Sequence, residues 1–243
     1  MRLDKFLCDM NIGTRSQVKE HIKKGLVLVN GQMIQSADHK IDEKSDSIVF
    51  QGRQLNYRKF VYYMLNKPKG VVSATQDNTA RTVTDLLAAE GRKDLFPVGR
   101  LDKDTEGLLL LTNDGALAHD LLSPKRHVDK TYRVEITHAL SREDIDRLEQ
   151  GVDIGEERLT LPAKVEVCSE KVIHLTIREG KFHQVKRMLQ AVGNQVTELK
   201  RIRFGSITLD EKLAPGEYRA LTPQEEASLN ERVSTLIYRE DRL

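Results

Sequence analysis

The spacing of apolar side chains changes near residue 60, and this change constrains the fold more than any other feature of the sequence. Apolar residues at helical spacing begin the chain, at Leu3, Phe6, Leu7 and Met10. Beyond residue 60, short strands joined by hairpin-like turns outnumber the helices. We therefore predict an α+β protein with a small domain at 1–59 and a larger domain at 60–243, built on a large mixed or antiparallel β-sheet flanked by helices.

The small domain is predicted to contain two helices followed by a β-hairpin. Thr14 and Gln17 have the spacing of a capping box, so a second helix starts there, and it ends at Gly25. The dipeptide Asn30-Gly31 is typical of a tight hairpin turn. The polar stretch 51–59 is expected to link this domain to the next.

Basic side chains are concentrated in two parts of a chain whose net charge is only +2. Residues 1–60 hold 11 Lys and Arg against 7 Asp and Glu, and residues 181–203 hold six against Glu198 alone. Two basic islands on a nearly neutral chain fit a polyanion as partner, although solvated helix faces are often locally basic too. Arg15, Lys19 and Lys23 fall at helical spacing on one stripe of the second helix.

The small domain resembles the S4 RNA-binding domain at residues 1–7, 16–19 and 27–31. The resemblance implies that its helices and hairpin present basic side chains to RNA. Such contacts to phosphates give affinity and position without reading sequence. The side chains implied are Arg2, Lys5, Arg15, Lys19 and Lys23. A protein-interaction module of two helices and a hairpin is the alternative.

The segment 98–108 holds the carboxylates that could carry chemistry. Asp102, Asp104 and Glu106 match the opening of an EF-hand calcium loop, but the twelfth position holds Asn113 instead of a bidentate Glu. In an aspartate-nucleophile phosphotransferase the aspartate normally ends a buried apolar strand, whereas here the apolar run follows it. The residues therefore support neither metal-dependent hypothesis well.

Four motifs in the larger domain resemble those of the pseudouridine synthases. Residues 99–115 resemble the central motif, in the branch that includes the enzyme of small-subunit ribosomal RNA. The other three motifs follow the expected order, LNKPKG at 65–70, KTYRV at 130–134 and EGKFHQVKRM at 179–188. Residues 1–7, 122–126 and 207–210 favour a small-subunit (16S) over a large-subunit (23S) ribosomal RNA target, although sibling enzymes share the catalytic motifs.

The resemblance implies roles for individual side chains. Asp102 would be the catalytic carboxylate that acts on the ribose of the target uridine, by adding to C1′ or by removing a proton from C2′. Tyr132 would lie against the flipped uracil and take the final proton from C5, and Lys186 would be the basic partner of Asp102. Further substrate contacts are expected at Arg100, Thr105, Lys67, His183 and Arg187.

These roles agree with elementary physical chemistry. A uridine inside folded RNA must be unstacked to expose its glycosidic bond, at a cost of a few kcal/mol that phosphate contacts elsewhere can supply. Burial raises the pKa of a carboxylate, while a cation within about 4–6 Å lowers it. Lys186 fits that need, and an unpaired buried charge would cost roughly 3–5 kcal/mol. Breaking and re-forming one glycosidic bond requires no metal or redox cofactor, so we expect none.

Each of these side chains also has a plainer interpretation. Tyr132 could simply pack in a sheet, and Lys186 with Arg187 could form an exposed helix face. Thr105 could cap backbone, and Lys67 could be an ordinary turn lysine. The whole chain could also be a ribosome-assembly factor that binds RNA without catalysis, but loss of the catalytic pair would be expected there, and both residues are present.

Composition and the first residues bear on compartment and partners. Cys8 and Cys168 are too few for a disulfide framework or a zinc cluster. The charged start lacks the apolar stretch of a signal peptide, and no apolar run of about 18 residues occurs. We therefore expect a cytoplasmic monomer without membrane contact, which acts on ribosomal RNA or on an assembling small ribosomal subunit.

Overall fold

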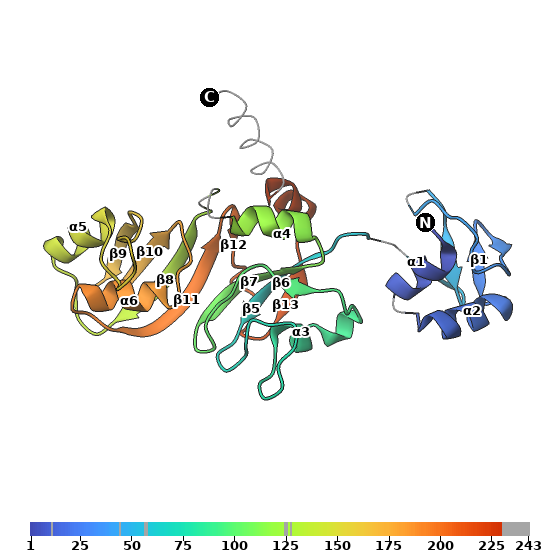
Figure 1. The fold of residues 1–243 in the computed structure, drawn as a ribbon, viewed down its shortest axis with the longest axis horizontal. Coiled ribbons are helices and arrows are strands. Elements are labelled where there is room, and N and C mark those ends of the chain that lie inside the picture. Colours follow the sequence, from blue (N-terminus) through green and yellow to red (C-terminus); the bar gives the residue numbers. More distant parts are fainter. Residues whose placement is uncertain (11, 44, 56–57, 124–125, 127, 230–243) are drawn as a thin grey trace, which may run out of the picture. The chain divides into compact units, whose positions relative to one another are not determined.

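The computed structural model describes residues 1–229 apart from 11, 44, 56–57, 124–125 and 127, and Figure 1 shows its ribbon. The chain divides into two compact units. One comprises residues 1–60 with 88–94, and the other comprises residues 61–87 with 95–243. The short 3-10 helix η1 (Ala88–Glu90) belongs to the first of these.

The first unit is built from two helices and a four-stranded antiparallel sheet. Its elements are α1 (Leu3–Asp9), α2 (Arg15–Lys23), β1 (Val27–Val29), β2 (Gln32–Met33), β3 (Ile48–Phe50) and β4 (Arg53–Leu55), with strand order β2-β1-β3-β4. The predicted capping box is confirmed, because the Thr14 hydroxyl accepts from the N–H of Gln17 and the Gln17 side chain accepts from the N–H of Thr14. Apolar side chains of both helices and of β1 close a core within this unit.

Two tight turns connect the strands of the first unit. Asn30 and Gly31 have φ values of 51° and 80°, as a two-residue hairpin between β1 and β2 requires, so the predicted turn is confirmed. The same geometry recurs at Gln51 and Gly52, with φ values of 47° and 79°. This second turn starts β4 inside the stretch predicted to be a polar link, and that part of the prediction is wrong.

The second unit holds a mixed nine-stranded sheet, which confirms the α+β class. Its strands are β5 (Tyr62–Lys67), β6 (Phe96–Pro97), β7 (Glu106–Thr112), β8 (Lys130–Ile136), β9 (Lys164–Ser169), β10 (Val172–Ile177), β11 (Val196–Phe204), β12 (Ile207–Thr208) and β13 (Tyr218–Ala220). Its named helices are α3 (Val83–Leu86), α4 (Gly115–Leu122), α5 (Arg142–Gln150) and α6 (Gln184–Ala191). The main path runs β13-β5-β7-β11-β8-β10-β9, with β6 on β7 and β12 on β11.

Helices cover both faces of this sheet (Figure 1). Side chains of α3, α5 and α6 pack on one face with Leu109 and Leu111 of β7, while α4 packs on the other face with Leu108 and Leu110. The apolar run of β7 is therefore buried on both sides, which explains why it is continuous instead of alternating. Pro68 and Gly70 predict a turn over residues 66–70, but β5 continues through Lys67, so the turn begins two residues later than expected.

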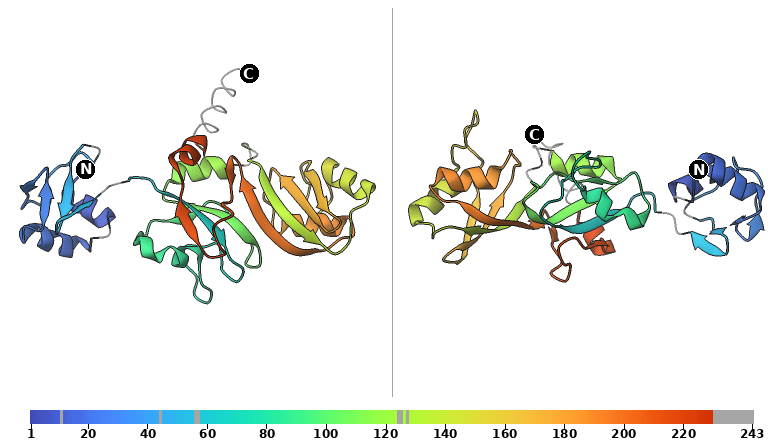
Figure 2. Two further views of the ribbon diagram at one scale, coloured as in Figure 1. Left: turned by 180° about the vertical axis from the view of Figure 1, so that it is seen from behind. Right: turned by 90° about the horizontal axis from the view of Figure 1, so that it is seen from below.

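The sheet consists of two parts joined along one short parallel ladder. β7 pairs with β11 at Glu106–Lys200 and Gly107–Arg201, and the other neighbours on the main path are antiparallel. Gly107 has a φ of 102°, and a Cβ placed there would lie 2.3 Å from the carbonyl oxygen of Arg201. Figure 2 shows the same unit from behind and from below, with β11 running between its two parts. Only glycine permits this close approach of the strands.

Other predicted elements can be compared with the structure. The sequence also predicts a helix of about ten residues from Ser141, and the capping box that Ser141 forms at the start of α5 confirms it. The sequence predicts a charged helix at the C-terminal end, after Pro215-Gly216, and residues 223–229 are helical. The residues beyond 229 and part of the 122–126 motif lie outside the described residues. Among the described residues, no helix has the length and apolar character needed to cross a bilayer.

Candidate active site

An open pocket lies where the loop before β7 meets β8, the end of β10 and the start of α6. The empty space in and directly in front of it is about 450 Å³. Predicted site residues that line it are Arg100, Asp102, Thr105, Tyr132, His183 and Lys186. Among the described residues that line this pocket, Asp102 is the single carboxylate.

The loop that carries Asp102 is fixed by hydrogen bonds along its backbone. The Ser73 hydroxyl donates to the carbonyl of Leu101 at 2.8 Å and accepts from its N–H at 3.0 Å. The N–H of Thr105 donates to the carbonyl of Asp102 at 3.1 Å, which closes the turn on itself. With the backbone held in this way, the Asp102 carboxylate is 29% exposed at the pocket.

Lys67 lies beneath this loop and is fully buried at the end of β5. Its Nζ donates to the backbone carbonyls of Asp102 at 3.0 Å, Thr105 at 2.9 Å and Pro68 at 3.1 Å. Burial lowers the pKa of Lys67 to about 8, and the charge of Asp104 opposes part of that change. The predicted substrate contact of Lys67 is therefore wrong, because its ammonium group binds the loop backbone and is closed off from solvent.

Lys186 lies between two carboxylates. Its Nζ is 3.5 Å from Asp102 Oδ2, but 2.7 and 2.8 Å from the two oxygens of Asp104. The hydrogen bond from Lys186 holds the pKa of Asp104 below its usual value. On its other side Asp102 faces His183, whose Nε2 is 3.6 Å from Oδ1. Two side chains that can carry positive charge thus meet the Asp102 carboxylate.

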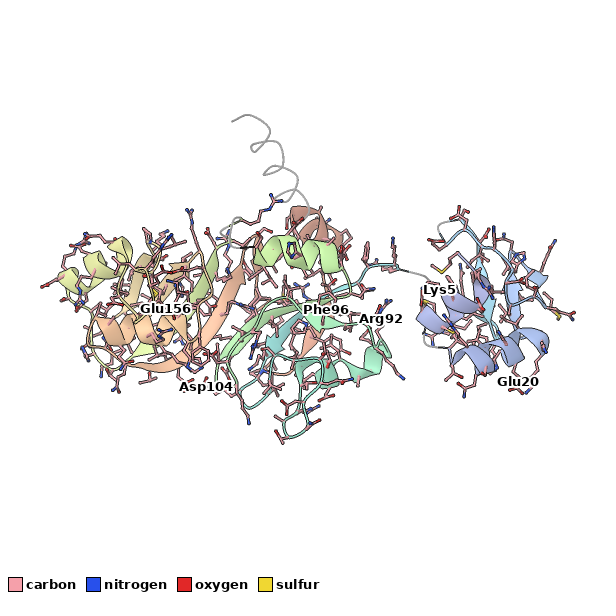
Figure 3. The ribbon with its side chains drawn as sticks, in the orientation of Figure 1. Lys5, Glu20, Arg92, Phe96, Asp104 and Glu156 are labelled. Atoms are coloured by element: carbon pink, nitrogen blue, oxygen red, sulfur yellow. The ribbon has the colours of Figure 1, made fainter. Side chains whose placement is uncertain are left out.

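The pairing of Lys186 with Asp104 was not predicted, since sequence reasoning assigned this lysine to Asp102 alone. Asp104 is labelled in Figure 3, and its side chain is 69% exposed. The available signal was the spacing of two carboxylates two residues apart in one short loop. That spacing suggested metal ligands, whereas in the structure the two carboxylates share an ammonium group.

The remaining pocket residues have distinct surroundings. Tyr132 is buried at 8% exposure on β8, where it packs in the main core and also lines the pocket. Arg100 is exposed at the pocket. The Thr105 hydroxyl is buried without a hydrogen-bond partner among the described residues, so it does not cap backbone.

Arg187 does not line the pocket, although a substrate contact was predicted for it. Its Nη1 donates to Glu156 Oε1 at 2.8 Å and to the carbonyl of Phe182 at 3.1 Å, and its Nη2 donates to the carbonyl of Ile154. Figure 3 labels Glu156. The guanidinium therefore ties residues 154–156 to the segment before α6, and its side chain stays 25% exposed outside the pocket, so the substrate contact of Arg187 stays a prediction.

In the first unit, some of the predicted RNA-binding cations are paired with carboxylates, and the others are exposed on α2. Arg2 is paired with Asp4 through two hydrogen bonds of 3.0 and 2.8 Å, and Lys5, labelled in Figure 3, is paired with Asp9 at 2.8 Å. The exposed cations of α2 are Arg15, Lys19 and Lys23. The last two border a shallow hollow together with residues 35–37. Within the described part of the chain, no group of three His, Cys, Asp or Glu side chains is arranged to hold a metal ion.

Comparison with known families identifies the class of protein. The sequence model of the RNA pseudouridylate synthases matches residues 61–191, and that of the S4 domain matches residues 1–48. This chain belongs to the RNA pseudouridine synthases, in a form that carries an N-terminal S4 domain, as its motifs predicted. It is therefore an isomerase that acts on RNA.

Individual relatives are similar over nearly the whole chain. An uncharacterized RNA pseudouridine synthase of Bacillus subtilis is 51% identical over 236 residues, which cover 95% of this chain and 99% of the relative. Ribosomal small subunit pseudouridine synthase A of Vibrio cholerae is 46% identical, over 94% of this chain and 99% of the relative. The Escherichia coli K12 protein of the same name is 42% identical, over 94% and 100%. A crystal structure of a pseudouridylate synthase matches with a TM-score of 0.66 and 39% identity, over 94% and 99%.

Proposed function

We propose that this enzyme converts one uridine of small-subunit (16S) ribosomal RNA to pseudouridine, with Asp102 as the catalytic carboxylate. The observation that carries the assignment of Asp102 is that it is the single carboxylate among the described residues lining the pocket. For the substrate, the support is that two relatives similar over more than nine-tenths of the chain are named ribosomal small subunit pseudouridine synthase A.

Asp102 acts on the ribose of a uridine flipped into the pocket. With Lys186 Nζ at 3.5 Å to offset its charge, the carboxylate serves as nucleophile at C1′ or as base at C2′. Either route breaks the bond between N1 and C1′, after which the uracil turns within the pocket and bonds to C1′ through C5. Formation of the bond from C5 releases the Asp102 carboxylate from C1′ or, in the other route, is followed by return of its proton to C2′. The proton on C5 then leaves through the Tyr132 hydroxyl, which takes it up while passing its own proton to solvent, and N1 takes up a proton in turn.

The remaining groups hold the substrate in place. Arg100, exposed at the pocket, contacts the flipped nucleotide or fills the gap that it leaves, and the unpartnered Thr105 hydroxyl offers a hydrogen bond inside. Residues 1–59 serve as the RNA-binding domain, and residues 60–243 serve as the catalytic domain. Phosphate contacts of the former offset the cost of unstacking, which is a few kcal/mol.

The test uses 16S ribosomal RNA transcribed without modifications, both free and assembled with small-subunit proteins. Pseudouridine is mapped by carbodiimide adducts and primer extension after incubation with wild type, Asp102→Asn or Asp104→Asn. Asp104→Asn removes the same charge two residues away, at a side chain that binds Lys186 but does not line the pocket, so it distinguishes loss of Asp102 itself from loss of a negative charge beside Lys186. We expect one new stop with wild type and with Asp104→Asn, and none with Asp102→Asn.

Each other outcome identifies a different error. A stop that survives in Asp102→Asn but disappears in Asp104→Asn would show that Asp102 is the wrong carboxylate and that the reaction depends on Asp104. Stops on 23S but not on 16S RNA would retain the reaction and reject the substrate. Tight binding of RNA without any stop on either RNA would leave an assembly factor as the function.

A further inference from the structure

Phe182 is exposed beside the pocket. Its side chain is 73% exposed, the highest value among the large apolar residues that the structure describes. Its neighbours in sequence, Lys181 and His183, both line the pocket. The Phe182 and His183 rings are stacked, with centroids 3.8 Å apart and planes inclined by 20°. One face of the Phe182 ring is thus covered by an aromatic ring, and its high exposure leaves the other face open.

The position of this ring is fixed through the backbone. The carbonyl of Phe182 accepts a hydrogen bond from Arg187, and the N–H of Lys181 donates to the Gln184 side chain at 2.9 Å. His183 has a φ of 49°, which residues other than glycine seldom adopt. Strained backbone of this kind persists where the surroundings enforce it, and it clusters at functional sites. The stacked pair is therefore held in place before any ligand arrives.

The charges around the ring indicate what it meets. Lys181, Lys186 and Arg100 line the adjoining pocket. Proteins that bind single-stranded nucleic acid combine such cations with exposed aromatic rings on which bases stack. An apolar protein surface or a lipid tail would gain nothing from these cations. A flat nucleobase attached to a phosphate backbone fits both features.

We propose that Phe182 is a stacking platform for the nucleobase next to the target uridine in the RNA chain. The inference rests on the proposed function, because flipping a uridine toward Asp102 leaves its neighbour without a stacking partner on one side. Phe182 supplies that partner at the pocket mouth. His183 stands behind it, 3.6 Å from Asp102 Oδ1, so the base stacks in a fixed relation to the catalytic carboxylate.

The first measurement compares kcat/KM on the 16S transcript for wild type, Phe182→Ala, Phe182→Trp and Val167→Ala. Val167 is a matched control, since it is an apolar side chain that is 55% exposed on β9 and does not line the pocket. Stacking on an aromatic side chain corresponds to roughly 5- to 150-fold in kcat/KM. We expect a loss in this range for Phe182→Ala, none for Val167→Ala, and near-normal activity for Phe182→Trp.

A second measurement identifies the base. Transcripts that carry an abasic site on the 5′ or the 3′ side of the modified uridine are assayed with wild type and Phe182→Ala. We expect one of these transcripts to slow wild type by the same factor as Phe182→Ala, and to slow Phe182→Ala no further. Melting temperatures of all variants should agree, since the ring is exposed.

The outcomes separate this inference from the function on which it rests. An active wild type with Phe182→Ala equal to Val167→Ala would overturn the stacking role and leave the reaction intact. The stacking role would also be overturned if, for both abasic transcripts, the loss of activity in Phe182→Ala were the product of the loss caused by the variant and the loss caused by the abasic site. A wild type that makes no pseudouridine would instead refute the proposed function.

Discussion

Lys67 provides a quantitative test of how the catalytic loop is held. Its ammonium group is fully buried and donates to backbone carbonyls of Asp102 and Thr105. Replacing it with Met keeps a similar volume and removes the charge and the donors. We expect the difference in unfolding free energy between wild type and Lys67→Met to depend on pH, because the amine titrates differently in the folded and unfolded chains.

The magnitude follows from the pKa of Lys67, which burial lowers from an ordinary 10.5 to about 8. Between these values the unfolded chain binds the proton more strongly than the folded chain, so the stability of wild type rises with pH. A difference of one pH unit in pKa corresponds to about 1.4 kcal/mol. From pH 7 to pH 10, wild type should therefore gain roughly 2–3 kcal/mol relative to Lys67→Met.

Urea unfolding followed by far-ultraviolet circular dichroism at pH 7 and pH 10 measures this difference. Lys103→Met is the matched control, because Lys103 is an exposed lysine of the same loop. Its difference from wild type should stay within about 0.5 kcal/mol at both pH values. If the difference in unfolding free energy between wild type and Lys67→Met were the same at pH 7 and pH 10, the reasoning would be refuted. Such a result would mean that the buried amine keeps an ordinary pKa.

Further predictions concern Gly107 at the contact between β7 and β11, the lysine that faces Asp102, and the N-terminal cap of α2. Gly107→Ala should destabilise the chain by about 3 kcal/mol or more, because its Cβ would meet the Arg201 backbone, whereas Gly115→Ala, with open space around it, should not lower the melting temperature. Lys186→Met should lower kcat on the RNA substrate about 100-fold with little change in KM, and equal kcat values would exclude a role in the chemical step. Thr14→Ala should weaken α2 by about 1 kcal/mol, seen as faster hydrogen exchange of its amides.

Elements whose signals are local could be predicted from the sequence. The capping box at Thr14 and the turn at Asn30-Gly31 depend on residues within three positions of each other, and both are confirmed. The edge strand β9 was missed, because most of its side chains are exposed and burial imposes no alternation on them. The turn at Gln51 was missed because glutamine is an unusual residue at a positive φ.

The candidate site shows the same division between local and distant determinants. Motif resemblance predicted that Asp102, Tyr132 and Lys186 belong together, and the structure places all three at one pocket. The burial of Lys67 could not be predicted, because its carbonyl partners at Asp102 and Thr105 lie 35 and 38 residues away. Beside a proline and a glycine, such a lysine has the local sequence of an exposed turn.

The short parallel ladder between β7 and β11 has a consequence for the newly made chain. Asp102 precedes β7, whereas Tyr132 lies on β8, Lys186 lies on α6 and His183 directly precedes α6, on the far side of that ladder. During translation Asp102 is synthesised long before Lys186, and β11 is synthesised after both. A chain that ends before β11 lacks the strand that joins β7 to β8, and we expect it not to hold Asp102 and Lys186 at their native distance. A complete pocket therefore forms only after synthesis has passed β11, the last long strand, and the two parts of the sheet have joined.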